Sequence, residues 1–266
     1  MSQYKGNPDF EHGQNERIGV LVCNVGTPEA PTTSAVRSYL REFLSDPRIV
    51  ELPRALWLPI LHGFILATRP RRSAKAYAEI WTTEGSPLMT LSKCLETALR
   101  ERLRNRHSDQ VVVELGMRYG RPSIASAIDR LLKANVRRIL VLPLFPQYAA
   151  ATTASAYDAV YAHCRTLRWV PELRLIGNYH ANDHYINALS DTVRTFWSEH
   201  GRGQRLLISF HGIPQNYFLA GDPYHCQCHA TARLLAGNLG LQNDDWVLAF
   251  QSRLGPRRWL EPYTDN

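Results

Sequence analysis

The chain has 266 residues, of which 44% are hydrophobic and 21% are charged. This composition is typical of a soluble globular protein and excludes a disordered or fibrous one, and the length allows one large domain or two smaller ones. The 31 basic and 24 acidic residues give a formal charge of +7, which favours an acidic partner such as anionic lipid, nucleic acid or a carboxylate-bearing substrate. Because the sequence has neither zinc-finger spacing nor a basic stretch interleaved with aromatic residues, we expect no nucleic acid among the partners.

Residues 1–16 are polar, and we expect them to form a disordered N-terminal tail. The five cysteines are an odd number, and no signal peptide is evident before Arg17. These features indicate reduced thiols and a cytoplasmic protein rather than a disulfide framework.

Six apolar runs predict strands, at residues 18–25, 111–115, 138–143, 173–176, 206–210 and 246–250. The stretches between them carry apolar residues at helical spacing, so the fold class is α/β, with parallel sheets flanked by helices. The strands fall into two sets around a helical region near residues 153–166. We therefore expect two Rossmann-like halves, at residues 17–165 and 166–266, facing a central cleft. No GxGxxG fingerprint follows the first strand, which argues against a nucleotide site.

The most apolar patch, residues 56–66, is flanked by Arg54 and by Arg69, Arg71 and Arg72. It is too short for a bilayer span, which needs about 20 apolar residues. Two interpretations stay open: a helix packed into a cleft wall, or a lip that rests on the inner membrane surface through Leu56, Trp57 and Phe64 with the arginines on lipid phosphates.

His211 directly follows the predicted strand at residues 206–210, which is read as buried on both faces. The carboxyl ends of strands in open α/β sheets are where ligands bind, and imidazole both exchanges protons near neutral pH and ligates metals. A histidine in this position is also often a hydrogen-bonded structural residue, so the position by itself leaves both roles open.

Further motifs accompany His211 in a fixed order along the chain. They include Asn24-Val25-Gly26-Thr27-Pro28, Phe43-Leu44-Ser45-Asp46, Gly116-Met117-Arg118-Tyr119-Gly120, Pro143-Leu144-Phe145-Pro146-Gln147-Tyr148, Gly221-Asp222-Pro223-Tyr224 and the run from Gln251 to Thr264. With these motifs the chain resembles the ferrochelatase family from about Arg17 to Thr264. The resemblance implies two chelatase-type halves and a lyase of haem biosynthesis that inserts ferrous iron into protoporphyrin IX to form protohaem.

The resemblance also makes His211 the expected catalytic residue, either as the base that removes pyrrole protons or as a transient metal ligand for iron. Arg118 follows a strand and is expected to pair with a porphyrin propionate, although it can equally cap a structural carboxylate. The remaining expected porphyrin-binding residues are Tyr119, Tyr148, Gln251, Ser252, Arg253 and Trp259, the last pressing on the macrocycle face.

The run His225-Cys226-Gln227-Cys228-His229 suggests a metal site, but it lacks the usual Cys-x-x-Cys spacing. Some ferrochelatases carry an iron–sulfur cluster, largely through cysteines beyond the matched region, and Ala150 stands where certain cluster-bearing members have a cysteine. We therefore expect no tightly bound cofactor and no iron–sulfur cluster, with ferrous iron as substrate only.

In the family, further strand and helix units follow the Gln251–Thr264 motif and carry a glutamate that faces the catalytic histidine. The chain ends at Asn266, so we expect a C-terminally truncated second half. Glu96 lies in a similar local motif but in the first half, and it is interpreted as a surface helix residue. The alternative function is a non-catalytic porphyrin-binding fragment that lacks this glutamate.

Overall fold

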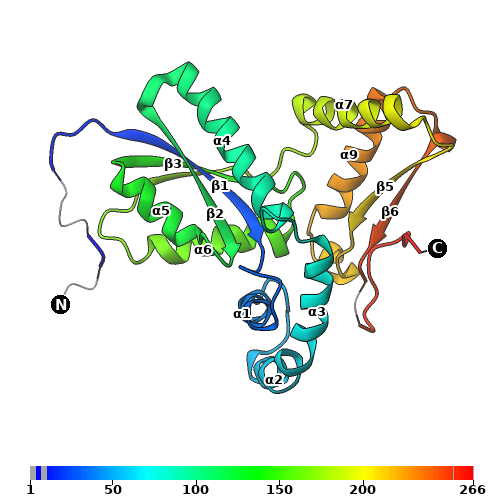
Figure 1. The fold of residues 1–266 in the computed structure, drawn as a ribbon, viewed down its shortest axis with the longest axis horizontal. Coiled ribbons are helices and arrows are strands. Elements are labelled where there is room, and N and C mark those ends of the chain that lie inside the picture. The colour runs from blue at the N-terminus through cyan, green and yellow to red at the C-terminus, as the bar shows by residue number, and fades with distance from the viewer. Residues whose placement is uncertain (1–3, 7–10, 254, 266) are drawn as a thin grey trace. The chain divides into compact units, whose positions relative to one another are not determined.

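The apolar run after Arg17 forms the central strand β1 (Arg17–Gly26) of a four-stranded parallel sheet with the order β2-β1-β3-β4. The computed structural model describes residues 4–6, 11–253 and 255–265. The chain divides into two units, Met1–Leu144 with Ala150–Ile176 and Phe145–Ala149 with Gly177–Asn266, which we describe separately (Figure 1).

The first unit is built on this sheet. Its other strands are β2 (Val111–Tyr119), β3 (Val136–Pro143) and β4 (Glu172–Leu175), and its helices are α1 (Thr33–Leu44), α2 (Arg54–Ile60), η1 (Leu61–Ile65), α3 (Leu66–Ile80), α4 (Pro87–His107), η2 (Ser108–Gln110), α5 (Ile124–Lys133), η3 (Ala150–Ala154) and α6 (Ser155–Cys164). Helices α5 and α6 cover one face of the sheet and α4 covers the other (Figure 1).

The continuous apolar sequence of β1 follows from burial on both faces. Leu21 and Cys23 pack with α5 and α6, whereas Val20 and Val22 pack with β2 and with partly buried side chains of α4. Successive side chains of a strand point to opposite faces, so a strand covered on both sides needs apolar residues throughout. The prediction of a doubly covered parallel sheet is confirmed for this unit.

Helices α1, α2 and α3, with the π-helical turn η1, form a separate layer of the first unit with its own apolar cluster. The apolar patch at residues 56–66 is helical, with Leu61 and Leu66 buried in this cluster. Trp57 also packs against it, and its indole Nε1 donates a hydrogen bond to the Leu44 carbonyl at 2.7 Å. Leu56 and Phe64 are 57% and 64% exposed, so only part of the patch faces solvent.

The second unit contains the parallel strands β5 (Leu206–His211) and β6 (Trp246–Gln251). Its helices are α7 (Asp183–His200), α8 (Gln215–Leu219), α9 (Tyr224–Asn238) and the short turn η4 (Asn243–Asp245). Ile208, Phe210, Leu248 and Phe250 form one apolar cluster with residues of α8 and α9.

Residues 206–210 form a strand as predicted, but the prediction that this strand is buried on both faces is wrong. Burial alternates along β5, and Leu207 and the neighbouring Val247 are 51% and 42% exposed. Helices α8 and α9 lie on the face that carries Phe210 and Phe250, because residues of both helices belong to that cluster. The other face therefore carries Leu207, Ser209 and His211.

The two units also differ in extent from the halves expected at residues 17–165 and 166–266. Strand β4 pairs with β3 from Arg138↔Glu172 to Val141↔Leu175, so residues up to 176 belong to the first unit. Of the expected tail at residues 1–16, residues 1–3 and 7–10 lie outside the described residues. Lys5 exchanges backbone hydrogen bonds with Thr166 and Arg168.

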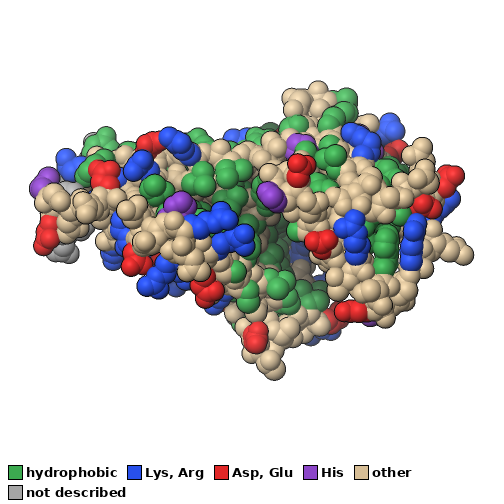
Figure 2. Space-filling view, turned by 90° about the horizontal axis from the view of Figure 1, so that it is seen from above, with side chains coloured by type: hydrophobic (Ala, Val, Ile, Leu, Met, Phe, Trp, Pro, Cys, Tyr) green, Lys and Arg blue, Asp and Glu red, His purple; other side chains and the backbone are tan. Residues whose placement is uncertain are grey.

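The described helices include none that is long and apolar enough to cross a membrane. On the face seen in Figure 2, basic and acidic side chains are interspersed, so the net charge does not collect there in a single patch.

Candidate functional site

His211 is the last residue of β5 and lies in register with Gln251, the last residue of β6. Both side chains therefore stand at the carboxyl edge of the two-stranded sheet, on the face opposite to α9. The Nδ1 atom of His211 lies 2.7 Å from the Gly212 carbonyl oxygen. A carbonyl only accepts, so Nδ1 carries a proton, and in the neutral tautomer that this contact selects Nε2 presents a lone pair. Among the described residues no carboxylate is bonded to His211. A neutral imidazole with a free Nε2 can accept a proton or bind a metal.

Trp259 lies beside this histidine, with ring centroids 6.4 Å apart and ring planes at 57°. Backbone contacts hold the two segments together: Gly212 donates to the Gln251 carbonyl at 2.7 Å, and Leu260 donates to the Ile213 carbonyl at 3.0 Å. A Cβ atom on Gly212 would lie 3.1 Å from the Gln251 carbonyl oxygen and 3.3 Å from the Trp259 ring. The glycine therefore permits the close approach of Trp259 to the end of β5.

Ser252 and Arg253 follow β6 directly. Ser252 has a φ of +71°, which is unusual for a residue with a side chain and redirects the chain as it leaves the strand. The Arg253 guanidinium lies 4.4 Å from the centre of the Tyr263 ring and donates to Asp265 at 2.6 Å. His211, Gln251, Ser252, Arg253 and Trp259 thus gather at one end of the sheet, from segments 40–48 residues apart in sequence.

Tyr148 also belongs to the second unit but attaches to a different element. Its backbone N–H donates to the Gln227 side chain of α9 at 2.7 Å, and the neighbouring Gln147 side chain donates to Thr231 at 2.9 Å. The segment at residues 145–149 is therefore anchored along α9. The described contacts of Tyr148 do not include His211.

Arg118 and Tyr119 end β2 in the first unit, and both converge on Asp46. Arg118 donates through Nη2 to Asp46 and through Nε to Ser155, the latter at 2.7 Å. The Tyr119 hydroxyl donates to Asp46 at 2.8 Å, as Ser155 does at 2.6 Å, and the Arg48 backbone N–H donates at 2.8 Å. Arg118 therefore pairs with a structural carboxylate, which was one of the two roles expected for it from the sequence. Tyr119 is only 1% exposed, so its ring offers almost no surface to a ligand.

Burial by itself would raise the pKa of Asp46, but the hydrogen bonds from Ser155, the Arg48 backbone and Tyr119, together with the Arg118 charge, outweigh it and lower that pKa. Burial also raises the pKa of Tyr119, so its hydroxyl stays protonated and acts as a donor. Asp46 is therefore an ionised, fully engaged carboxylate that fixes the orientation of Arg118.

The sequence profile of the ferrochelatase family matches residues 17–266. The chain belongs to the ferrochelatase family. The ferrochelatase of Thioalkalivibrio sulfidiphilus is 55% identical over 263 residues, and those of Nitrosococcus oceani and Idiomarina loihiensis are 53% and 50% identical over the same number. Each comparison covers 99% of this chain and 71–72% of the relative's length.

Asp46 is the residue that sequence reasoning missed in this ferrochelatase-family chain. It was present in the motif Phe43-Leu44-Ser45-Asp46 that supported the resemblance, but no role was assigned to it. Its partners Arg118 and Ser155 lie 72 and 109 residues further along the chain. The sequence indicated only that an acidic residue lies inside a family motif. That this residue pairs with Arg118 and Ser155 could be seen only in the folded structure.

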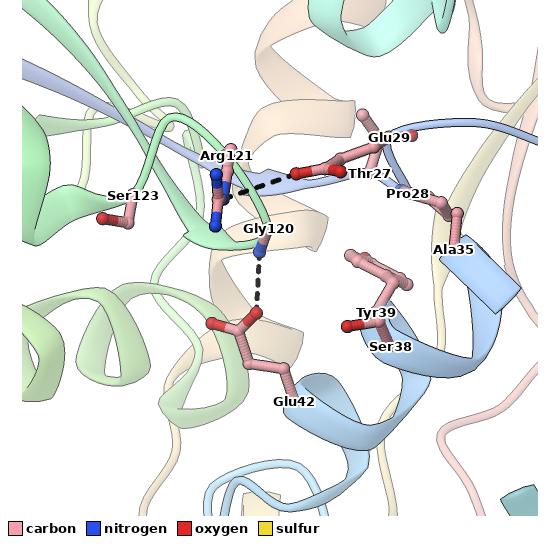
Figure 3. A pocket seen from close by; sticks show the side chains of 10 residues that line it. All are labelled: Thr27, Pro28, Glu29, Ala35, Ser38, Tyr39, Glu42, Gly120, Arg121 and Ser123. Atoms are coloured by element: carbon pink, nitrogen blue, oxygen red, sulfur yellow. Dashed lines mark hydrogen bonds and ion pairs between the residues drawn. The ribbon is translucent and has the colours of Figure 1, made fainter.

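A pocket of about 370 Å³ in the first unit has none of the predicted site residues in its lining (Figure 3). It is lined by the β1–α1 loop, helix α1 and the β2–α5 loop. Glu42 accepts a hydrogen bond from the Gly120 backbone N–H at 2.9 Å, and Glu29 pairs with Arg121 at 3.4 Å. Its acidic groups are thus already engaged, and the residues that it gathers are not those expected for porphyrin.

The cysteines in the described part of this ferrochelatase-family chain are free thiols. Cys226 is exposed, whereas Cys228 is buried, and burial raises the pKa of Cys228 to about 12. A thiol with so high a pKa remains protonated and is a poor metal ligand. The described residues contain no group of three or more metal-ligating side chains.

Proposed function

We propose that this chain is a ferrochelatase, a lyase that inserts ferrous iron into protoporphyrin IX and forms protohaem. The observation that carries the proposal is the position of His211, whose Nδ1 is bonded to the Gly212 carbonyl, beside Trp259 at the carboxyl end of β5 in a chain from this family. Insertion requires the two pyrrole N–H protons to leave the macrocycle, and His211 Nε2 is the group that accepts a proton. Iron and porphyrin are substrates, and no resident cofactor takes part in the proposal.

The aromatic face of Trp259 suits a flat apolar ligand stacked beside His211. Gln251, Ser252 and Arg253 form the polar border of the same edge and are proposed to contact the porphyrin periphery. Tyr148, held by its backbone on α9, is proposed as a further ring or carboxylate contact.

Arg118 is proposed to bind a porphyrin propionate. Its Nε and Nη2 atoms are occupied by Ser155 and Asp46, whereas Nη1 makes no hydrogen bond within the described residues. The side chain remains 19% exposed, so a carboxylate can reach that third nitrogen. Tyr119 contributes in this proposal by holding Asp46 in place.

We further propose a cytoplasmic protein that touches the inner membrane surface. Leu56 and Phe64 are exposed apolar side chains, and Arg69, Arg71 and Arg72 on α3 are exposed as well. An apolar patch with adjacent cations is the combination that binds an anionic lipid interface. Trp57, which packs inward, is the weaker candidate for this contact.

The proposed activity is tested with the 266-residue chain, deuteroporphyrin and Zn²⁺, by following the fluorescence of the zinc porphyrin, and then with Fe²⁺ under anaerobic conditions. We expect metallation well above the protein-free rate. Tight porphyrin binding with no metallation above that rate would contradict the proposal and support the porphyrin-binding alternative.

A further inference from the structure

Two histidines lie one helical turn apart on α9, at positions 225 and 229. Residues four apart share one face of a helix, so both imidazoles project on the same side. Their ring centroids are 4.4 Å apart and the ring planes make an angle of 50°. Both side chains are half-buried. The spacing is the one that lets two helical histidines ligate the same metal ion.

Aromatic side chains restrict where these rings can lie. The His225 ring lies 4.9 Å from the Phe218 ring and stacks on Phe250 at 5.6 Å, and the His229 ring lies 6.2 Å from Phe250. Packing of this kind limits the rotamers of both imidazoles, so little conformational entropy remains to be lost when an ion binds.

The nitrogen atoms of the two rings are available for ligation. Within the described residues, neither imidazole makes a hydrogen bond or an ion pair.

We propose that His225 and His229 form a two-histidine site for a first-row divalent transition-metal ion, with water completing the coordination. Cys228 is buried and is not counted among the ligands. The helix N-terminus and Arg233 both disfavour a cation, so the site is weaker than one with three or four protein ligands.

This site is distinct from His211. Helix α9 packs on the sheet face that carries Phe250, whereas His211 stands on the opposite face of the same two strands. The proposal is independent of the role proposed for His211, and either can fail without the other.

The test is Ni²⁺ binding by the 266-residue chain, measured by titration calorimetry in a His211→Ala background that removes the other proposed ligand. His225→Ala and His229→Ala are each expected to weaken Ni²⁺ binding at least tenfold. His200→Ala is the matched control, since His200 also stacks on an aromatic ring, Phe196, but lacks a second histidine one turn away. Its affinity should stay within twofold. Retention of affinity by either α9 variant, or an equal loss in His200→Ala, would overturn the proposal.

Two further measurements guard against misfolding of the variants. The double variant His229→Ala/Ala230→His keeps the number of histidines but moves one off the shared face, and it should also lose Ni²⁺. The otherwise unmodified His211→Ala chain with one equivalent of Cu²⁺ should give an electron paramagnetic resonance spectrum with two coupled imidazole nitrogens. A spectrum with fewer than two would refute the site without recourse to any α9 variant.

Discussion

At the scale of single residues, His211 owes its chemistry to one local contact. The Gly212 carbonyl fixes the proton on Nδ1 and leaves Nε2 as the basic atom. Substitution by alanine removes this base but leaves Trp259 and the strand edge in place.

We expect His211→Ala to lower the rate of metal insertion by about 10²–10⁴-fold, the usual contribution of general base catalysis, with little change in porphyrin binding. Zinc insertion and porphyrin fluorescence quenching measure the two effects separately. His184→Ala, which alters an exposed histidine of α7, is the control. Near-normal turnover in His211→Ala would exclude this residue as the base.

Arg118 has two possible roles that substrate chemistry separates. If its guanidinium binds a propionate, Arg118→Leu should cost about 1.5–3 kcal/mol in kcat/KM on the natural dicarboxylate porphyrin, and much less on its dimethyl ester. An equal loss on both substrates would mean that Arg118 serves only the Asp46 network.

The ionisation of Asp46 makes the stability contributed by this network depend on pH. Its pKa is lowered in the folded protein, so its ionised form stabilises the fold above the ordinary aspartate pKa of about 4, and that stabilisation is lost as the pH falls below it. Asp46→Asn should lower the free energy of unfolding by about 1–3 kcal/mol at pH 7 and by less near pH 3.5. Urea unfolding at the two pH values measures this. The exposed Arg48–Asp158 pair supplies the control, since Asp158→Asn should cost under about 1 kcal/mol. A pH-independent loss in Asp46→Asn would contradict the pKa direction.

At the scale of secondary-structure elements, the ends of β1 and β2 approach so closely that only glycine fits. Gly26 has a φ of +101°, and a Cβ atom there would lie 1.8 Å from the Tyr119 carbonyl oxygen. This contact joins the Gly26-Thr27 turn to the strand end that carries Arg118 and Tyr119.

Gly26→Ala should therefore lower the free energy of unfolding by about 1–3 kcal/mol or more, because the added atom overlaps backbone and the φ is strained. Gly63→Ala in η1 is the matched control, since nothing lies within 4 Å of its added Cβ and its φ is not in the left-handed region. Thermal unfolding of both variants distinguishes them. Equal melting temperatures would show that the β1–β2 edge is not rigid.

At the scale of the whole molecule, the two units bury their sheets to different degrees. The first has four parallel strands covered on both faces, whereas the second has two strands with Leu207 and Val247 exposed on one face. A two-stranded sheet is marginally stable without cover, so local opening should be easier in the second unit.

Hydrogen exchange on the 266-residue chain should therefore show faster amide exchange in β5 and β6 than in β1 and β3. The comparison is internal to one sample, so concentration and buffer are matched. Equal protection in the two sheets would show that the second unit is as stable as the first.

The sequence by itself determined the fold class, the strands and the family, because apolar runs and motif residues are local signals that survive without three-dimensional contacts. The sequence also predicted that His211, Gln251 and Trp259 lie at the carboxyl ends of strands or in the loops that follow them, since parallel strands end on a common side. Tertiary structure alone decided the rest. Hydrogen bonds with β3 assign β4 to the first unit, and Asp46 meets Arg118 across 72 residues. Packing of α8 and α9 against β5 and β6 buries the side of β5 that carries Phe210. These features depend on which surfaces meet after folding, and no local pattern in the sequence specifies that.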